Sequence, residues 1–280
     1  MIILINYPIA IPYKYNNDKY NEIAKEFNII FLPRNKVEDL ITFIEMYKDI
    51  RINIAFPEGI SIDVCKKLQK KTDNFSIRLK VDDLPLIDFL RENKIKFFFD
   101  TTLPATNYTH LDFLIKIGVS DVYIADDLCY NLPDVSEYCH KYDVKVRLVL
   151  NRIPCTSPDK GINPCSPFYC PQDMRVLNKY YDIFEFDCGQ ETYDWHKFKV
   201  LYRAWFENHY WHGNLKEINP DIILNIDNDT YYKRLIDNKI VCGRRCNQRV
   251  SSPCRKCYQW LDISNLLQEK EWRFKDITQK

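Results

Sequence analysis

The sequence predicts an α/β fold, a (β/α)8 barrel of TIM type followed by a helical, cysteine-rich extension. Eight short runs of aliphatic, β-branched and aromatic residues alternate with segments in which apolar residues recur at helical spacing. The runs are apolar at successive positions, which is typical of parallel strands covered on both faces. Eight strand–helix units are the number that closes a barrel, but a doubly wound open sheet is an alternative because a strand count does not prove closure.

The predicted elements follow the chain in order. The strands span residues 2–6, 28–32, 51–56, 75–81, 96–99, 121–125, 144–150 and 183–186. The helices span residues 19–26, 36–47, 61–71, 84–93, 110–117, 132–141 and 172–180. Two of these helices follow Asn35 and Asn131, and asparagine is a favoured N-cap because its side-chain oxygen accepts a hydrogen bond from the first turn. We divide the chain into a barrel, 1–190, and an extension, 191–280, in which an aromatic helix and a cysteine-rich metal-binding segment pack on the barrel.

Composition and charge limit the classes of protein to which the chain can belong. Its 280 residues are 46% hydrophobic, enough for a large core, and 40 basic residues nearly balance 39 acidic ones. No net field draws such a protein to nucleic acid or membrane, so any nucleic-acid contact must be a local patch. No run reaches the length of a membrane span and residues 2–6 lack the features of a signal peptide, so we expect a cytoplasmic protein. In that compartment the 11 cysteines are more often metal ligands or buried residues than disulfides.

Polar residues follow every predicted strand. In a parallel barrel these positions share one face, the mouth at which the carboxyl ends of the strands converge and active sites lie. The candidates for acid–base or polar contacts with a substrate are Glu58, Asp100, Asp126 and Asp187. For any one of them the alternative is that strand ends meet solvent and are polar for that reason, so the prediction rests on the whole ring.

Four cysteines lie around the ends of the last two predicted strands, namely Cys155, Cys165, Cys170 and Cys188. Proline adjoins the first three, and proline makes a loop stiff and non-helical, which helps to hold thiolates around an ion. Their spacing lacks the paired C-x2-C knuckles of a zinc ribbon and suits an iron–sulfur cluster, with [4Fe-4S] as the predicted cofactor. The alternative is that these thiols are buried or incidental.

A second group of thiols comprises Cys242, Cys246, Cys254 and Cys257, in an otherwise polar segment. Packing does not explain four cysteines within 16 residues, and a structural zinc ion would fold such a loop. Alternatively, one or two of these thiols complete the cluster at the barrel mouth. Arginines are interleaved with these thiols, namely Arg244, Arg245, Arg249 and Arg255. They predict contacts with the phosphates of an RNA or DNA backbone; the alternative is that they offset the charge of the thiolates or are simply solvated.

The segment 192–214 is rich in aromatic residues that recur at helical spacing. We expect a long helix that packs on the barrel, with base stacking as the less favoured alternative. Its histidines, His196, His209 and His212, receive no assigned role because a histidine on an aromatic helix is more often structural.

The cysteine loops of this chain resemble those of the family called peptidase U32. The resemblance rests on residues 149–155 (VLNRIPC), 163–165 (NPC), Cys170 with Pro171, and 242–246 (CGRRC). It implies a barrel in which four cysteines hold an iron–sulfur cluster. It also implies a role in hydroxylating RNA bases or a quinone precursor, or, with weaker support, peptidase activity.

Two classes of function follow from these patterns. In the first, the protein is an iron–sulfur enzyme that modifies RNA or a small aromatic substrate at the barrel mouth. In the second, it is a catalytically silent, zinc-stapled module that binds nucleic acid or a protein partner. A peptidase or other hydrolase is a weaker third option. The chain has no H-E-x-x-H motif, phosphate-binding glycine loop or Ser/His/Asp order to support a zincin, a P-loop NTPase or a serine hydrolase.

Overall fold

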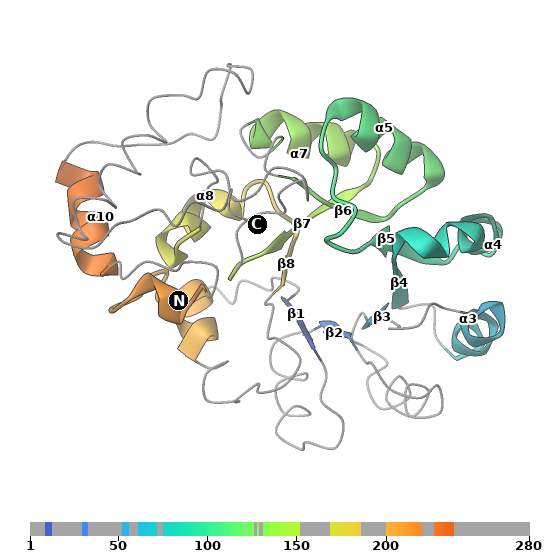
Figure 1. The fold of residues 1–280 in the computed structure, drawn as a ribbon, viewed down its shortest axis with the longest axis horizontal. Coiled ribbons are helices and arrows are strands. Elements are labelled where there is room, and N and C mark those ends of the chain that lie inside the picture. The colour runs from blue at the N-terminus through green and yellow to red at the C-terminus, as the bar shows by residue number, and fades with distance from the viewer. Residues whose placement is uncertain are drawn as a thin grey trace, which may run out of the picture.

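The computed structural model describes residues 9–12, 30–32, 52–55, 61–71, 75–125, 128, 131–151, 169–185, 200–219 and 227–237. Within these residues the strands are β1 (Ile9–Pro12), β2 (Ile30–Leu32), β3 (Ile52–Ala55), β4 (Phe75–Leu79), β5 (Lys96–Phe99), β6 (Asp121–Tyr123), β7 (Lys145–Val149) and β8 (Ile183–Glu185). Figure 1 shows their arrangement along the chain. All strands from β2 to β8 fall inside the runs predicted from the sequence.

The first strand differs from the prediction. The predicted run at 2–6 lies outside the described residues, and the strand that pairs with β2 and β8 is residues 9–12. Pro8 precedes this strand and Pro12 is its last residue, and proline weakens a strand prediction because it cannot donate a ladder hydrogen bond.

The described strands form two parallel sheets. One has the order β2-β1-β8-β7-β6 and the other the order β3-β4-β5. Strands β2 and β3 are neighbours, as are β5 and β6, so the two sheets meet at both edges. At the second edge the backbone N–H of Ser120 donates to the carbonyl of Phe97 at 2.8 Å. Because the described ladders form two sheets rather than one, the closed eight-stranded barrel stays a prediction.

The helices are α3 (Ile62–Gln69), α4 (Ile87–Glu92), α5 (Tyr108–Ile117), α7 (Leu132–Lys141), α8 (Met174–Leu177) and α10 (Asn228–Asp237). Helix α5 has clear end signals: the Asn107 side chain accepts the N–H of His110, and Gly118 at φ 91° ends the helix. Asn131 stands at the predicted N-cap of α7, but its side chain makes no capping bond and donates instead to the Tyr108 hydroxyl at 3.1 Å.

Shorter helical turns lie between these helices and in the extension. They are the 3-10 helices η1 (Val81–Leu86), η2 (Pro171–Asp173) and η4 (Leu215–Glu217), and the π-helix η3 (Arg203–Glu207). The helix predicted at 172–180 is therefore shorter than expected, since η2 and α8 are followed by turns through residue 180. Among the described residues, no helix has both the length and the hydropathy that a bilayer crossing requires.

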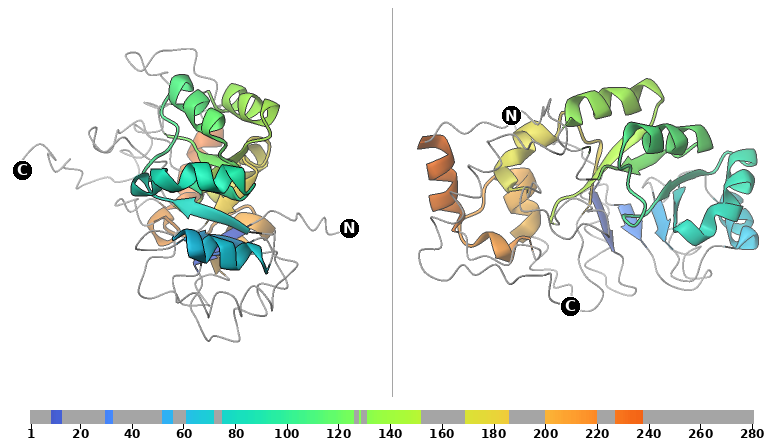
Figure 2. Two further views of the ribbon diagram at one scale, coloured as in Figure 1. Left: turned by 90° about the vertical axis from the view of Figure 1, so that its right-hand side faces the viewer. Right: turned by 45° about the horizontal axis from the view of Figure 1, so that its top comes forward.

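The strands have two different faces. On β7, Val146 and Leu148 belong to the apolar core, together with residues of α3, α4, α5 and α7. These helices lie outside the strands, as Figures 1 and 2 show. Arg147 stands between the two apolar residues and points to the opposite face, because side chains alternate along a strand. That opposite face is the one with buried charges.

The extension packs on β8 through aromatic side chains. Tyr202 stacks on Phe206 with ring centroids 5.3 Å apart, and Phe206 meets Phe184 of β8 edge-on at 6.0 Å. Trp205 is fully buried. The prediction of one long helix is wrong for its second half: residues 200–207 are helical, and the chain then bends at His209, where φ is 50°.

Candidate active site

Five charged or phenolic side chains from four strands meet on the inner face of the sheets. They form what we call the inner cluster, which comprises Arg78 (β4), Asp121 and Tyr123 (β6), Arg147 (β7) and Glu185 (β8). Arg147 is only 1% exposed and Asp121 is fully buried. Buried charges are costly unless they are paired and hydrogen-bonded, so the contacts within this group decide whether it is stable.

Glu185 is the acceptor at the centre of the inner cluster. Its Oε1 accepts from Arg78 Nη1 at 3.2 Å. Its Oε2 accepts from the Tyr123 hydroxyl at 2.5 Å and from Arg147 Nη2 at 3.4 Å. One carboxylate thus holds two guanidinium groups and a phenol.

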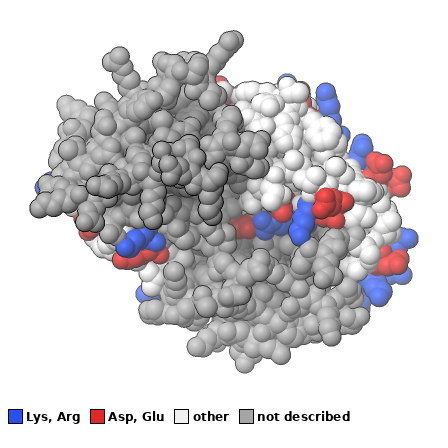
Figure 3. Space-filling model, viewed as in Figure 1, with Lys and Arg blue, Asp and Glu red and all other residues white. Residues whose placement is uncertain are grey.

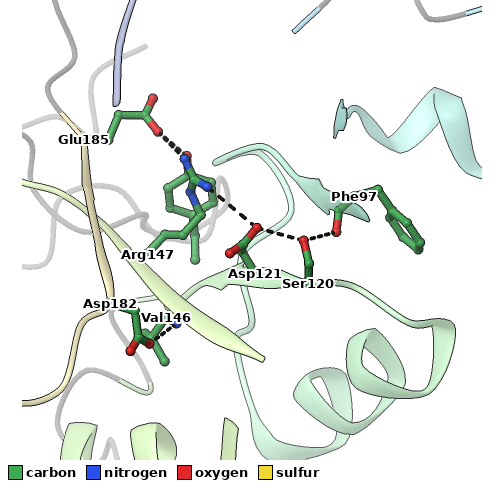
Figure 4. Close-up of polar contacts among 8 residues, drawn as sticks. Phe97, Ser120, Asp121, Val146, Arg147, Asp182 and Glu185 are labelled. Atoms are coloured by element: carbon green, nitrogen blue, oxygen red, sulfur yellow. Dashed lines mark hydrogen bonds and ion pairs between the residues drawn. The ribbon is translucent and has the colours of Figure 1, made fainter. Parts of the chain in front are cut away.

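Arg147 links this carboxylate to a second one. Its Nη1 lies 3.8 Å from Asp121 Oδ2, which also accepts from the Ser120 hydroxyl at 2.8 Å (Figure 4). The guanidinium carbon lies 4.0 Å from the centre of the Phe98 ring, a cation–π contact. Arg147 is therefore held by two carboxylates and an aromatic face and is fixed in position.

Burial and charge shift the titration of these groups. Burial acts to lower the pKa of Arg78, but its attraction to Tyr123, Glu185 and Asp100 raises that pKa overall. Arg147 behaves in the same way: burial lowers its pKa, and Tyr123, Asp121 and Glu185 more than reverse the effect. Burial, followed by the charge of Glu185, raises the pKa of Tyr123 well above its ordinary value. The phenol therefore stays protonated and acts as a hydrogen-bond donor.

The inner cluster lies toward the carboxyl ends of the strands. Tyr123 and Glu185 are the last residues of β6 and β8, and Arg78 is the last but one of β4. The Arg78 side chain is 18% exposed while that of Arg147 is fully buried, so Arg78 is the member that solvent reaches. Figure 3 shows acidic and basic side chains gathered near the centre of one face of the molecule. In parallel α/β folds this end of the strands is where ligands bind.

Of the four predicted catalytic acids, the structure describes Asp100 alone. It follows β5, and its Oδ1 accepts hydrogen bonds from the backbone N–H and the hydroxyl of Thr102. Its charge contributes to the raised pKa of Arg78, so it belongs electrostatically to the site. Glu58, Asp126 and Asp187 lie outside the described residues.

Cys170 is the one predicted cluster ligand within the described residues. It is buried, 7% exposed, directly before η2, and its N–H donates to Asp173 Oδ2 at 2.9 Å. Cys155, Cys165 and Cys188 lie outside the described residues.

The strands that lead into the cysteine loops lie side by side. Strands β7 and β8 are paired, and the backbone N–H of Leu150 donates to the carbonyl of Glu185 at 2.8 Å. Cys155 comes five residues after Leu150, and Cys188 three after Glu185. Both segments therefore start at one place, next to the inner cluster.

Unpaired donors lie near Cys170. Turn η2 is a neighbour of η3. The side-chain amide of Gln172 in η2 and the indole N–H of Trp205 in η3 are buried and have no hydrogen-bond partner among the described residues. Buried polar groups in native proteins nearly always have partners, so this region has unused capacity for an acceptor.

Two other cysteines are structural. Cys65 in α3 and Cys139 in α7 are fully buried in the apolar core. Burial raises the pKa of Cys65 to about 11, and burial together with the charge of Asp182 raises that of Cys139 to about 12. Both thiols stay protonated near neutral pH and serve as packing groups.

The second thiol group and its arginines are not described. These residues are Cys242, Cys246, Cys254, Cys257, Arg244, Arg245, Arg249 and Arg255. Within the part of the chain that the structure describes, no three His, Cys, Asp or Glu side chains gather as metal ligands. Of the histidines in the aromatic segment, His209 Nδ1 contacts the Trp205 carbonyl at 2.8 Å, and His212 Nδ1 lies 3.2 Å from Asp229 Oδ1.

The inner cluster is absent from the residues predicted from the sequence, because the predicted acids follow the strands and the members of the cluster lie within them. The signal was present: Arg78, Arg147 and Glu185 are charged residues between apolar neighbours of predicted strands. Fully buried charges are rare unless they are paired, so three of them in apolar strands predict a polar site on one face.

Comparison with models of protein families finds no match, and no curated protein has a matching sequence. The resemblance of the cysteine loops to the peptidase U32 family therefore stays a prediction.

Proposed function

We propose that the protein is an iron–sulfur enzyme of U32-like type whose active site lies at the carboxyl ends of its parallel strands. The observation that carries the proposal is the pairing of β7 with β8 beside the inner cluster. Two of the four proposed ligands follow these strands, and Cys170 is buried just before the turn that leads back to β8. The proposed ligands are Cys155, Cys165, Cys170 and Cys188.

The surroundings of Cys170 fit such a group. An iron–sulfur cluster brings thiolate and sulfide acceptors, and hydrogen bonds to sulfur are one of the ways in which a protein sets its potential. Gln172 Nε2 and Trp205 Nε1 are buried donors that have no acceptor in the part of the chain that the structure describes. The same thiols would alternatively hold a zinc ion.

The protein's own residues bind and orient the substrate in this proposal. When bound, the cluster supplies electron transfer, which no side chain of the chain provides. Arg78, held by Glu185 and reached by solvent, contacts the substrate, while Asp100 accepts hydrogen bonds or a proton. The substrate is RNA or a small aromatic compound, modified by hydroxylation. An RNA substrate would contact Arg244, Arg245, Arg249 and Arg255, and Cys242, Cys246, Cys254 and Cys257 in the same segment would hold a structural zinc ion.

Anaerobic purification with metal and sulfide analysis tests the proposal. We expect brown protein with iron and acid-labile sulfide, and we expect Cys155→Ala and Cys170→Ala to lose that iron. Cys65→Ala and Cys139→Ala are the matched controls, because both thiols are buried in the apolar core and should not affect iron. Equal iron in all four variants refutes the ligand assignment. Colourless protein with stoichiometric zinc favours the zinc-stapled binding module instead.

A further inference from the structure

We infer that Arg78 is the anchor for an oxyanion, a carboxylate or a phosphate, that the substrate carries. This inference specifies the class of substrate that binds at the proposed active site, and it rests on the proposed function in treating the bound molecule as a substrate. The binding site itself depends only on the inner cluster.

The hydrogen bonding of Arg78 leaves part of its guanidinium group available. It donates from Nη1 to Glu185 and makes no other hydrogen bond to described residues. A guanidinium group has five N–H donors in a planar fork that matches a carboxylate or phosphate edge. Its partial exposure, 18% for the side chain, means that a ligand from solvent can approach it.

Arg78 is held in place before any ligand arrives. Glu185 fixes one Nη, and the guanidinium carbon lies 5.9 Å from the centre of the Tyr123 ring. Glu185 itself is held by Arg147 and Tyr123 from two other strands. A preorganised group loses little side-chain entropy on binding, which is what distinguishes such an arginine from one that is free on the surface.

Arg147 is unsuited to this role although it has the same charge. Its side chain is fully buried, both of its terminal nitrogens face carboxylates, and Phe98 covers its face. Arg147 therefore holds the carboxylates in place inside the protein, and Arg78 is the guanidinium group that a ligand can reach from solvent.

The charge balance predicts how the anion binds. Within the inner cluster, the two guanidinium groups are balanced by Glu185 and Asp121, and Asp100 adds a further negative charge that interacts with Arg78. Net attraction is therefore weak, and binding depends on the directed hydrogen bonds of the fork. Replacing Asp100 with Asn should strengthen anion binding, because it removes a negative charge and keeps an oxygen that can accept from the Thr102 N–H.

The experiment is a titration of the full-length protein with phenyl phosphate and with benzoate at constant ionic strength. The ¹⁵N resonance of the Arg78 guanidinium reports binding directly. Phenol, which resembles both probes but lacks the oxyanion, controls for binding of the ring. Tighter binding of phenyl phosphate indicates a phosphate-bearing substrate such as RNA, and tighter binding of benzoate indicates a carboxylate.

Variants test the role of the fork. Arg78→Lys keeps the charge beside Glu185 but loses the planar donors, so it should bind the preferred probe about tenfold more weakly than the unmodified protein. Arg78→Gln also loses the charge, so its binding should be weakened by at least the same factor. Asp100→Asn should bind more tightly. Arg91→Lys is the control, because Arg91 is 52% exposed on α4 and, among the described residues, its ion-pair partner is Asp88 rather than a member of the inner cluster. Circular dichroism checks that each variant is folded.

Two results would overturn the inference. One is that neither probe gives a saturable shift in the unmodified protein. The other is that the variants Arg78→Lys, Arg78→Gln and Arg91→Lys all bind the preferred probe as tightly as the unmodified protein does. Iron measured on the same samples separates this inference from the proposed function: anion binding without iron keeps the inference and rejects the cluster, and iron without anion binding does the reverse.

Discussion

Replacing Glu185 with Gln should strongly destabilise the protein, because it removes the one carboxylate that pairs with two arginines. The change is nearly isosteric, so it tests charge and hydrogen bonding rather than volume. In the native protein Glu185 is 5% exposed and accepts from Arg78, Arg147 and Tyr123. The glutamine amide nitrogen carries donors only, so at least one of the three present donors would lose its acceptor.

The magnitude follows from burial. Breaking a buried pair by removing one partner costs about 3–5 kcal/mol. Arg147 is fully buried and cannot turn to water, whereas Arg78 at 18% exposure can do so in part. We therefore expect a loss of about 3–5 kcal/mol, a large share of the roughly 5–15 kcal/mol by which single domains are stable.

Urea unfolding followed by far-ultraviolet circular dichroism measures the effect. Asp88→Asn is the matched control, since Asp88 pairs with Arg91 at 3.9 Å on the surface and its side chain is 89% exposed. It should change the free energy of unfolding by less than about 1 kcal/mol. A double-mutant cycle of Arg78→Gln with Glu185→Gln should show coupling of about 0.5–3 kcal/mol. If Glu185→Gln costs no more than Asp88→Asn, the reasoning that the buried pairs of Glu185 with Arg78 and Arg147 stabilise the fold is refuted.

Two further predictions concern a helix cap and the buried thiols. Asn107→Ala should lower the free energy of unfolding by about 1 kcal/mol, because it removes the side chain that caps the His110 N–H. Asn131→Ala loses no capping bond and should lower it by less. Urea unfolding of both variants measures the difference. Cys65 and Cys139 should resist iodoacetamide at pH 8 in the folded protein and react in urea, as mass spectrometry of the peptides would show, because burial raises the pKa of each. Both pKa values lie above the value of 9.0 expected in the unfolded chain, so burial of the protonated thiols stabilises the folded state in full below pH 9. This stabilisation is lost as the pH rises toward 11 and 12. A melting temperature that does not fall over this interval would contradict the raised pKa values of Cys65 and Cys139.

Local pattern sufficed to locate most of the strands and helices that the structure describes; the helices predicted at 19–26 and 36–47 lie outside the described residues. The run at 96–99 is a strand with the predicted bounds, and α7 spans the predicted 132–141, because period and flanking residues are properties of short segments. Prediction failed where local signals conflict. Pro8 and Pro12 weaken the strand signal of β1. In the segment 192–214 the helical spacing of aromatic residues continues past the bend at His209, although the helix ends before it.

The candidate site was partly predictable. Asp100 was selected by the rule that parallel strands present their carboxyl ends at one edge, and the structure shows that its charge acts on Arg78; its catalytic role stays a prediction. The pairing of Arg78 with Glu185 was not predictable in the same way, because the sequence of a strand does not show whether a charged residue in it faces water or a buried partner.

The sequence by itself determined most of the strands and helices that the structure describes, and the order in which Cys155, Cys165 and Cys170 follow β7 and Cys188 follows β8 along the chain. Only the tertiary structure decided that Arg78 meets Glu185, 107 residues away on the other sheet. The physical reason is that periodicity reports which face of a strand is apolar, whereas the partner of a buried charge is set by how strands distant in the chain pack together.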